Sequence, residues 1–152
     1  MQVGINYLLT RQRMWKTIMN LQEAAYISFA TFRKSGKAVE TPVWFAGDTE
    51  DIDQQGRQCY YIFSAGEAGK VKRLRNSARS RIAPCTVTGK VLGDWHNSAS
   101  TILHTPEEIA LAQAALVKKY GWQMRMIDLS SKLAGKYNKR AYIRVCLTEN
   151  SE

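Results

Sequence analysis

The feature that most constrains the fold is a series of six short β-rich runs, most of which follow one another across short turns. Runs 25–32 and 38–46 flank the turn 33–37, a pattern typical of a β-hairpin. The other runs are 59–64, 80–87, 95–103 and 141–147. Consecutive hairpins form antiparallel sheets, because parallel strands need long crossover connections. We therefore predict a mainly β fold, a six-stranded antiparallel barrel with flanking helices.

Three helices are predicted from periodicity and capping. Residues 11–23 and 122–133 carry apolar side chains at intervals of three and four. Another helix starts at Pro106, where Thr105 is a suitable N-cap, and stops at Gly121. These helices alternate with the β-rich runs, so we expect them to pack outside the barrel.

A basic segment follows the third run through a turn of small residues. The run 59–64 leads through the turn 65–69 into a lysine-rich helix. Exposed N–H groups in such a turn and the positive end of the helix attract a phosphate dianion. Full charges at this place come from Lys70, Lys72 and Arg73. We predict a phosphate site here.

Length and composition favour a single globular domain spanning 1–152. No stretch resembles a signal peptide or a membrane span, so we expect a cytoplasmic protein without a membrane partner. Cys59, Cys85 and Cys146 are odd in number and widely spaced, which favours reduced, buried thiols over a disulfide framework or a zinc site. With two histidines and no metal-binding motif, we expect no metal centre.

The net charge of +9 indicates an anionic partner but does not choose one. Nucleic acid, nucleotide cofactors and polycarboxylates would all be attracted. No Ser-His-Asp set, paired carboxylates or Walker loop is present, so hydrolytic and nucleotide-cleaving chemistry has no support in the sequence.

Several segments, in order, resemble the flavin and deazaflavin oxidoreductases related to pyridoxamine 5′-phosphate oxidase. They are 29–45, with Thr31 to Gly36 and Thr41 to Phe45, then Gly69 to Arg75, 78–85 and Lys119 to Trp122. The ordered set covers about four-fifths of the chain and is most similar to the F420-dependent branch. One departure is Asn76-Ser77-Ala78-Arg79, where the family has a proline before the arginine.

The resemblance implies a split β-barrel that forms a homodimer, with F420 or FMN in a groove between the subunits. Ser64 and Lys70 match positions that hold the cofactor phosphate, and Lys72 and Arg73 lie on the helix that lines the same pocket. The strand beside the cofactor ring is matched by Thr41, Pro42, Val43 and Trp44. The implied activity is hydride transfer between the cofactor and an unidentified small organic substrate, and no side chain is assigned as catalytic.

Two other interpretations stay open, and so do the roles of several residues. The protein could be a non-catalytic carrier of a flavin or tetrapyrrole, or, with less support, a basic nucleic-acid-binding barrel. Pro42 indicates an edge strand, a bulge or a ligand-facing gap. For Trp44, a packing role and a cofactor contact are equally supported. Arg33 is expected to be a solvated surface charge. Trp95, Trp122, Met124 and Met126 are expected in the core or a dimer interface rather than in a ligand wall.

Overall fold

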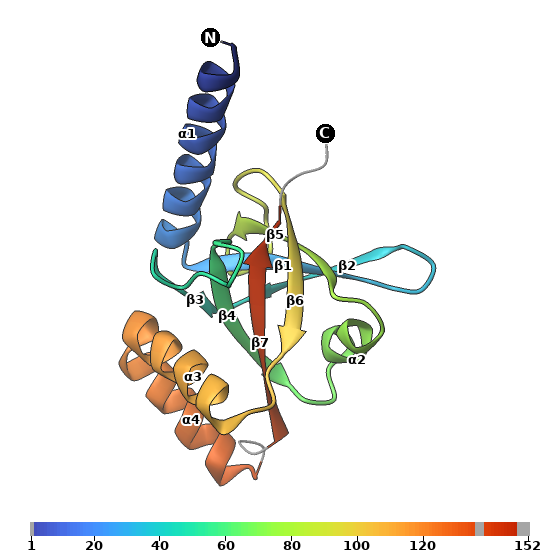
Figure 1. Ribbon diagram of the computed structural model, residues 1–152. Helices are drawn as coiled ribbons and strands as arrows, with labels where there is room; N and C mark the ends of the chain where they lie inside the picture. The colour runs from blue at the N-terminus through green and yellow to red at the C-terminus, as the bar shows by residue number, and fades with distance from the viewer. Residues whose placement is uncertain (1, 136–138, 149–152) are drawn as a thin grey trace.

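The computed structural model describes residues 2–135 and 139–148, which form a curled antiparallel sheet with four surrounding helices (Figure 1). The helices are α1 (Gln2–Glu23), α2 (Gly69–Asn76), α3 (Pro106–Tyr120) and α4 (Trp122–Leu133). The strands are β1 (Tyr26–Phe32), β2 (Ala38–Val43), β3 (Phe45–Ala46), β4 (Cys59–Ala65), β5 (Arg79–Cys85), β6 (His96–Ile102) and β7 (Arg140–Leu147).

The sheet order is β2-β1-β5-β6-β7-β4-β3, and every neighbouring pair is antiparallel. The run 38–46 divides at Trp44 into β2 and β3, which pair with β1 and β4 at opposite edges of the sheet. The prediction of six strands was therefore wrong, because one run supplies a strand to each edge and the described chain has seven. Since a single residue joins the two edge strands, the sheet curls into a split barrel, and Pro42 lies in edge strand β2.

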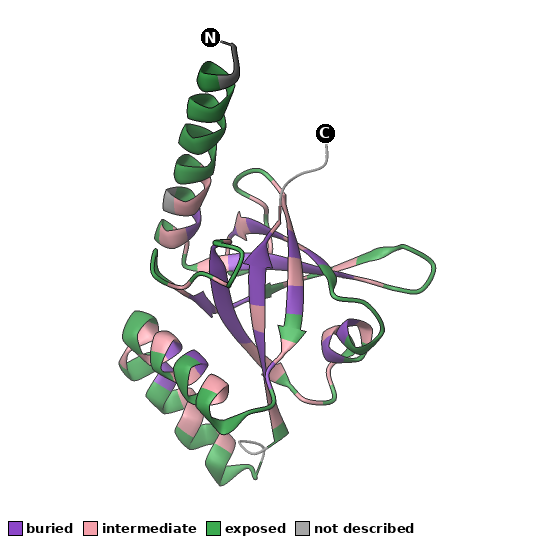
Figure 2. Ribbon diagram, viewed as in Figure 1, coloured by how far each residue is buried: buried purple, intermediate pink, exposed green. Residues whose placement is uncertain are grey.

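The apolar core lies inside the curled sheet, and a second cluster lies outside it. Alternate residues of β4 serve both: Tyr60 and Ile62 join the inner cluster, and Tyr61 joins the outer one. Helix α2 covers one end of the barrel with Val71 and Leu74. The outer cluster joins residues of the sheet to residues of α3 and α4, and Figure 2 shows buried positions on these helices. The expected arrangement of helices around a barrel is confirmed.

Helix α1 is longer than the predicted 11–23 and stands away from the barrel (Figures 1 and 2). Leu21 near its C-terminal end is fully buried, whereas Met14 and Trp15 are exposed. The apolar spacing located only the C-terminal half of the helix, and of that half only the last turns, around Leu21, pack against the barrel. None of the described helices has the length and hydropathy that a membrane crossing requires.

The predicted start and stop of α3 are confirmed. Thr105 Oγ1 accepts the Glu108 backbone N–H at 3.3 Å, and Pro106 occupies the first helical position. Gly121 ends the helix with a φ of 58°, a conformation that favours glycine, and α4 begins directly after it.

The prediction that all three cysteines are free thiols was wrong for two of them. Cys59 of β4 lies directly opposite Cys146 of β7, and the two form a disulfide. Their separation of 87 residues hides a pairing that only the strand register brings about. Cys85 is free and buried, as expected, and burial raises the pKa of its thiol. Disulfides persist mainly in oxidising compartments, so the cytoplasmic location stays a prediction.

Candidate functional site

Hydroxyl and cationic groups meet where α2 covers one end of the barrel. Lys70 Nζ lies 3.5 Å from Ser64 Oγ at the end of β4, and Arg73 Nε donates to Thr31 Oγ1 at 2.7 Å at the end of β1. The Arg73 guanidinium lies close to Gly69, the first residue of α2: a Cβ there would lie 2.8 Å from Arg73 Nη1, so a side chain would displace the guanidinium. The guanidinium therefore lies against the first turn of α2, whose N-terminus no side chain caps. We call Ser64, Gly69, Lys70 and Arg73 the α2 cradle.

The cations of the α2 cradle are not neutralised by any carboxylate of the described residues. The ion pairs among the described residues are Arg57–Asp53, Lys118–Asp48 and Arg140–Asp128, and none of them includes a cradle residue. Burial, and then the charge of Arg73, lowers the pKa of Lys70; burial, and then Arg33, lowers the pKa of Arg73. A cation that lowers the pKa of its neighbour adds to a local surplus of positive charge, which a bound anion would relieve. The cradle is therefore suited to a phosphate dianion.

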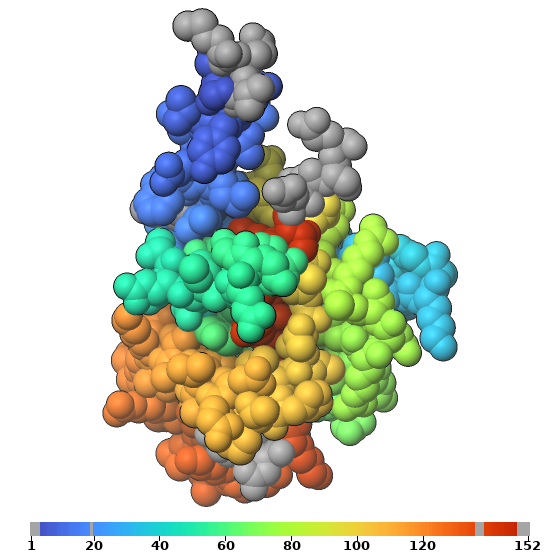
Figure 3. Space-filling model, in the orientation of Figure 1, coloured from blue at the N-terminus to red at the C-terminus, as the bar shows by residue number. Residues whose placement is uncertain are grey.

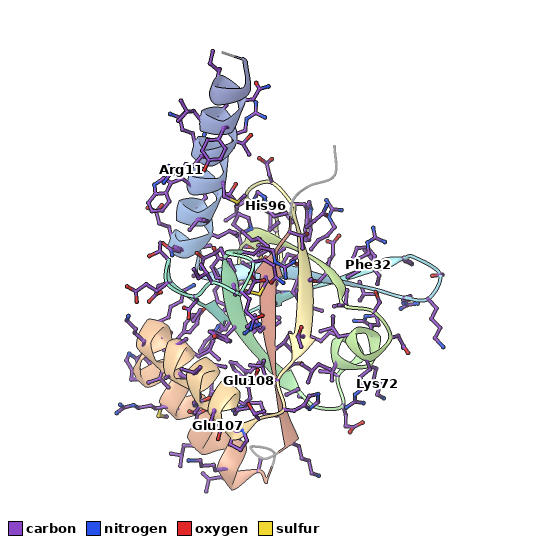
Figure 4. All side chains as sticks on the ribbon, viewed as in Figure 1. Arg11, Phe32, Lys72, His96, Glu107 and Glu108 are labelled. Atoms are coloured by element: carbon purple, nitrogen blue, oxygen red, sulfur yellow. A yellow bond between two sulfur atoms is a disulfide. The ribbon has the colours of Figure 1, made fainter. Side chains whose placement is uncertain are left out.

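An open groove of about 480 Å³ adjoins the cradle, between the β1–β2 turn and α2. Its cationic lining residues are Arg33, Lys34, Lys72, Arg73 and Arg79, and none of the described residues that line it is acidic. The guanidinium of Arg79 lies over the Phe32 ring, 3.9 Å from its centre. Figure 3 shows the turn beside segment 66–80, and Figure 4 labels Phe32 and Lys72 on the two sides of this region. We call it the basic groove, and its charge suits an extended polyanion.

Trp44, predicted to lie beside the cofactor ring, occupies the bend between β2 and β3. Its ring stacks on Tyr120 of α3, with ring centres 4.4 Å apart and an interplanar angle of 11°. It also meets Phe63 edge-on at 6.5 Å. The Tyr120 hydroxyl accepts the Phe45 backbone N–H at 3.0 Å, which fixes the bend against α3. Trp44 therefore has a packing role, and its contact with a cofactor stays a prediction.

The predicted site residues of β2, Thr41, Pro42 and Val43, do not all face the same side of the sheet. Val43 is buried in the inner core, and Thr41, two residues earlier, faces the same side. The Thr41 hydroxyl oxygen is buried and has no hydrogen-bond partner among the described residues. Pro42 is exposed. A ligand on the outer side of β2 would meet the backbone and Pro42 rather than the Thr41 hydroxyl.

The structure brings some of the predicted site residues together and separates others. Ser64, Lys70 and Arg73 meet in the α2 cradle, and Lys72 lines the adjoining groove. The segment 41–44 covers the end of edge strand β2 and the bend after it. Trp44 contacts Phe63 in the outer cluster, whereas Ser64, the next residue of β4, faces the other side of the sheet, so the structure places Trp44 apart from the cradle.

Sequence analysis did not assign three residues that lie at the α2 cradle or line the basic groove, and it gave a fourth only a surface role. Thr31, Lys34 and Arg79 were not assigned to the site, and Arg33 was treated as a solvated charge. The pair Arg33-Lys34 in a hairpin turn was a visible signal. Its meaning depends on the packing of that turn beside α2, which follows from the sheet order and not from local sequence.

A second groove, of about 1220 Å³, separates α1 from the β5–β6 side of the barrel. His96 lies in it, half-buried, and burial lowers the pKa of its imidazole, although Asp94 opposes the shift. The Arg81 guanidinium lies 5.3 Å from the centre of the Trp95 ring in the same groove. Figure 4 labels His96 close to the base of α1. Sequence analysis did not predict this groove, which we call the His96 groove.

Comparison with known proteins assigns the chain to a fold and not to a family. No protein-family model and no curated protein matches it. A proposed 5-nitroimidazole antibiotic resistance protein from Bacteroides thetaiotaomicron superposes with a TM-score of 0.61 and 12% identity, covering 91% of this chain and 80% of that chain. The heme storage protein HutZ from Vibrio cholerae superposes with a TM-score of 0.60 and 10% identity, and the match covers 85% of each chain.

A third structure with this fold is a proposed pyridoxamine 5′-phosphate oxidase from Listeria innocua. Its TM-score is 0.57 at 10% identity, and the match covers 90% of this chain and 94% of that one. The architecture that this chain shares with all three structures is the split β-barrel. Identities this low establish the fold and leave the activity to be argued from the site.

Proposed function

We propose that the protein is an oxidoreductase that transfers hydride between a bound F420 or FMN cofactor and a small organic substrate. The observation that carries this proposal is the α2 cradle, where two cations and a hydroxyl converge and no carboxylate of the described part of the chain pairs with the cations. A flavin-type ring, when bound, supplies the hydride chemistry. The chain would then need only to bind the cofactor, orient it and exclude water, which agrees with the absence of a hydrolytic motif from the sequence.

The cradle fits the phosphate group that FMN and F420 share. Lys70 and Arg73 would supply charge-assisted hydrogen bonds, and the Ser64 hydroxyl would add a neutral one. The lack of a side chain at Gly69 leaves the space beside the helix N-terminus to the Arg73 guanidinium. An anion bound here would also raise the pKa of Lys70 toward its ordinary value, since it would offset the repulsion from Arg73.

The ring would lie along the outer side of β2 and the bend at Trp44. As an edge strand, β2 keeps backbone groups that are not paired within the sheet, and these could accept or donate hydrogen bonds to a ring. This side of the sheet is open in one chain. We therefore propose a homodimer in which the second subunit completes the groove and shields the ring from water.

The basic groove supports F420 over FMN. FMN ends at a single phosphate, which the α2 cradle satisfies. F420 continues through a phosphodiester into an oligoglutamate tail, and Lys72, Arg33 and Lys34 line a groove that such a tail could follow. The carboxylates of the tail would replace the anionic partners that these cations lack.

A second candidate function, a non-catalytic tetrapyrrole carrier, is favoured by the His96 groove. A histidine whose pKa is lowered is neutral at pH 7, the form that ligates heme iron. Arg81 in the same groove could bind a propionate carboxylate, and the aromatic face of Trp95 could pack against the macrocycle. The shared fold with a heme storage protein agrees with this alternative.

The absorbance spectrum of the protein separates the two functions. We expect protein incubated with FMN, F420 or heme, and then freed of unbound ligand by gel filtration, to retain F420 or FMN at one per chain. Retention of heme alone, with a Soret band that is altered in His96→Ala, would contradict the oxidoreductase and establish the carrier. Retention of none of the three would contradict both.

A further inference from the structure

Helix α4 carries an apolar stripe on its exposed side. Trp122, Met126, Leu129 and Leu133 follow one another at intervals of four, three and four residues, the a/d spacing of a coiled coil. Their exposed fractions are 73%, 56%, 52% and 81%. We call these four residues the α4 seam. The periodicity that predicted this helix is therefore formed by residues that its own chain leaves exposed.

The opposite side of α4 binds the helix to the body of the protein. Met124 is fully buried in the outer core. Asp128 accepts hydrogen bonds from Arg140 at 2.6 Å and Gln113 at 2.6 Å, and Ser131 accepts one from Arg140 at 2.8 Å. Positions 124, 128 and 131 lie on one side of a helix with 3.6 residues per turn, and the seam lies on the other. The inner side of α4 is therefore occupied by its own chain, while the apolar seam on the other side is exposed.

The seam is large enough for a specific contact with a copy of itself. Four side chains of these sizes and exposures present on the order of 500 Å² of apolar surface, near the upper end for a patch on a monomer. Two copies would bury on the order of 1,000 Å² from the seam side chains alone, which reaches the area expected of a biological interface.

We propose that α4 packs against α4 of a second copy of this chain, seam to seam and parallel. In heptad lettering, Met126 and Leu133 occupy position a. Arg125 and Lys132 then occupy position g, and Ser130 occupies position e. An antiparallel pair would bring the g cations of the two helices together, whereas a parallel pair sets Arg125 opposite Ser130 of the other copy. The contact is two-fold symmetric and does not depend on the cofactor proposal.

Sedimentation equilibrium of Met126→Glu with Leu129→Glu tests the contact. Both side chains are more than half exposed, so folding should be retained, and circular dichroism checks it. We expect the assembled mass to fall to half the wild-type value, because two carboxylates would face two more across the seam. Leu92→Glu is the matched control, since Leu92 is 63% exposed on a loop away from α4, and it should keep the wild-type mass.

A cysteine at the seam tests the orientation. In a parallel pair, Leu129 meets Leu129 of the other copy, so Leu129→Cys should form a cross-linked dimer in air, while Leu92→Cys should not. A double-glutamate variant that keeps the wild-type mass would overturn the contact. Failure of Leu129→Cys to cross-link, together with a halved mass in the double variant, would overturn the parallel arrangement. Either result would leave the cofactor proposal intact, because cofactor retention is measured separately.

Discussion

Replacing Lys70 with alanine is expected to weaken cofactor binding about ten- to a hundredfold while leaving the fold nearly as stable as before. A hydrogen bond to a charged group contributes on the order of 1.5–3 kcal/mol, and the full contact with phosphate would be lost. Among the described residues, the Lys70 ammonium makes one long hydrogen bond, at 3.5 Å to Ser64, so little stability depends on it. Fluorescence titration with F420 and FMN measures the affinity, and thermal unfolding measures the stability.

Arg75→Ala is the matched control for this prediction. Arg75 is an exposed cation on the same helix but does not line the basic groove. Its loss changes the net charge by the same amount, so its effect reports long-range attraction alone. Equal affinities for Lys70→Ala and Arg75→Ala would show that the phosphate does not bind at the α2 cradle.

Replacing Asp128 with alanine is expected to lower the free energy of unfolding by about 3–5 kcal/mol. The Arg140 side chain is only 5% exposed, and its Nη1 lies 2.6 Å from Asp128 Oδ1. Burial lowers the pKa of Arg140, but hydrogen bonds to Asp128 and Tyr142 outweigh burial and raise it overall. Without the carboxylate, the buried Arg140 loses the charged partner at Nη1, and Gln113 loses an acceptor. The melting temperature should fall on the order of 10 °C.

Lys118→Ala removes an exposed ion pair from the neighbouring helix and serves as the comparison. Lys118 and Asp48 are 3.6 Å apart, and their side chains are 80% and 54% exposed. Exposed pairs contribute little, so we expect a change within about 0.5 kcal/mol. A loss of stability in Asp128→Ala as small as that of Lys118→Ala would mean that Arg140 finds other compensation when its carboxylate is removed.

The parts of the fold that local signals determine could be predicted from the sequence. The hairpin around 33–37, the capped start of α3 at Thr105 and the basic helix after Ser64 were all placed within a few residues. Each depends on turn chemistry, capping or periodicity within a short window.

The features that depend on register and closure could not be predicted. Cys59 faces Cys146 only because β4 pairs with β7, and the run 38–46 divides only because the two edges of the sheet meet at Trp44. The same holds for the basic groove, since the turn at Arg33 is brought beside α2 by the closure of the barrel. The spacing along α4 was visible, but which side of the helix the chain covers was not.

Binding titrations of F420 and FMN at low and high ionic strength test the cofactor proposal most directly. We expect F420 to bind more tightly than FMN and to lose affinity more steeply as salt rises, because only its tail engages the basic groove by long-range attraction. Lys72→Ala combined with Arg73→Ala should narrow the difference between the two. If FMN binds as well as F420 or better at both ionic strengths, the deazaflavin assignment fails and an FMN-dependent enzyme replaces it. If neither binds, the α2 cradle is not a cofactor site.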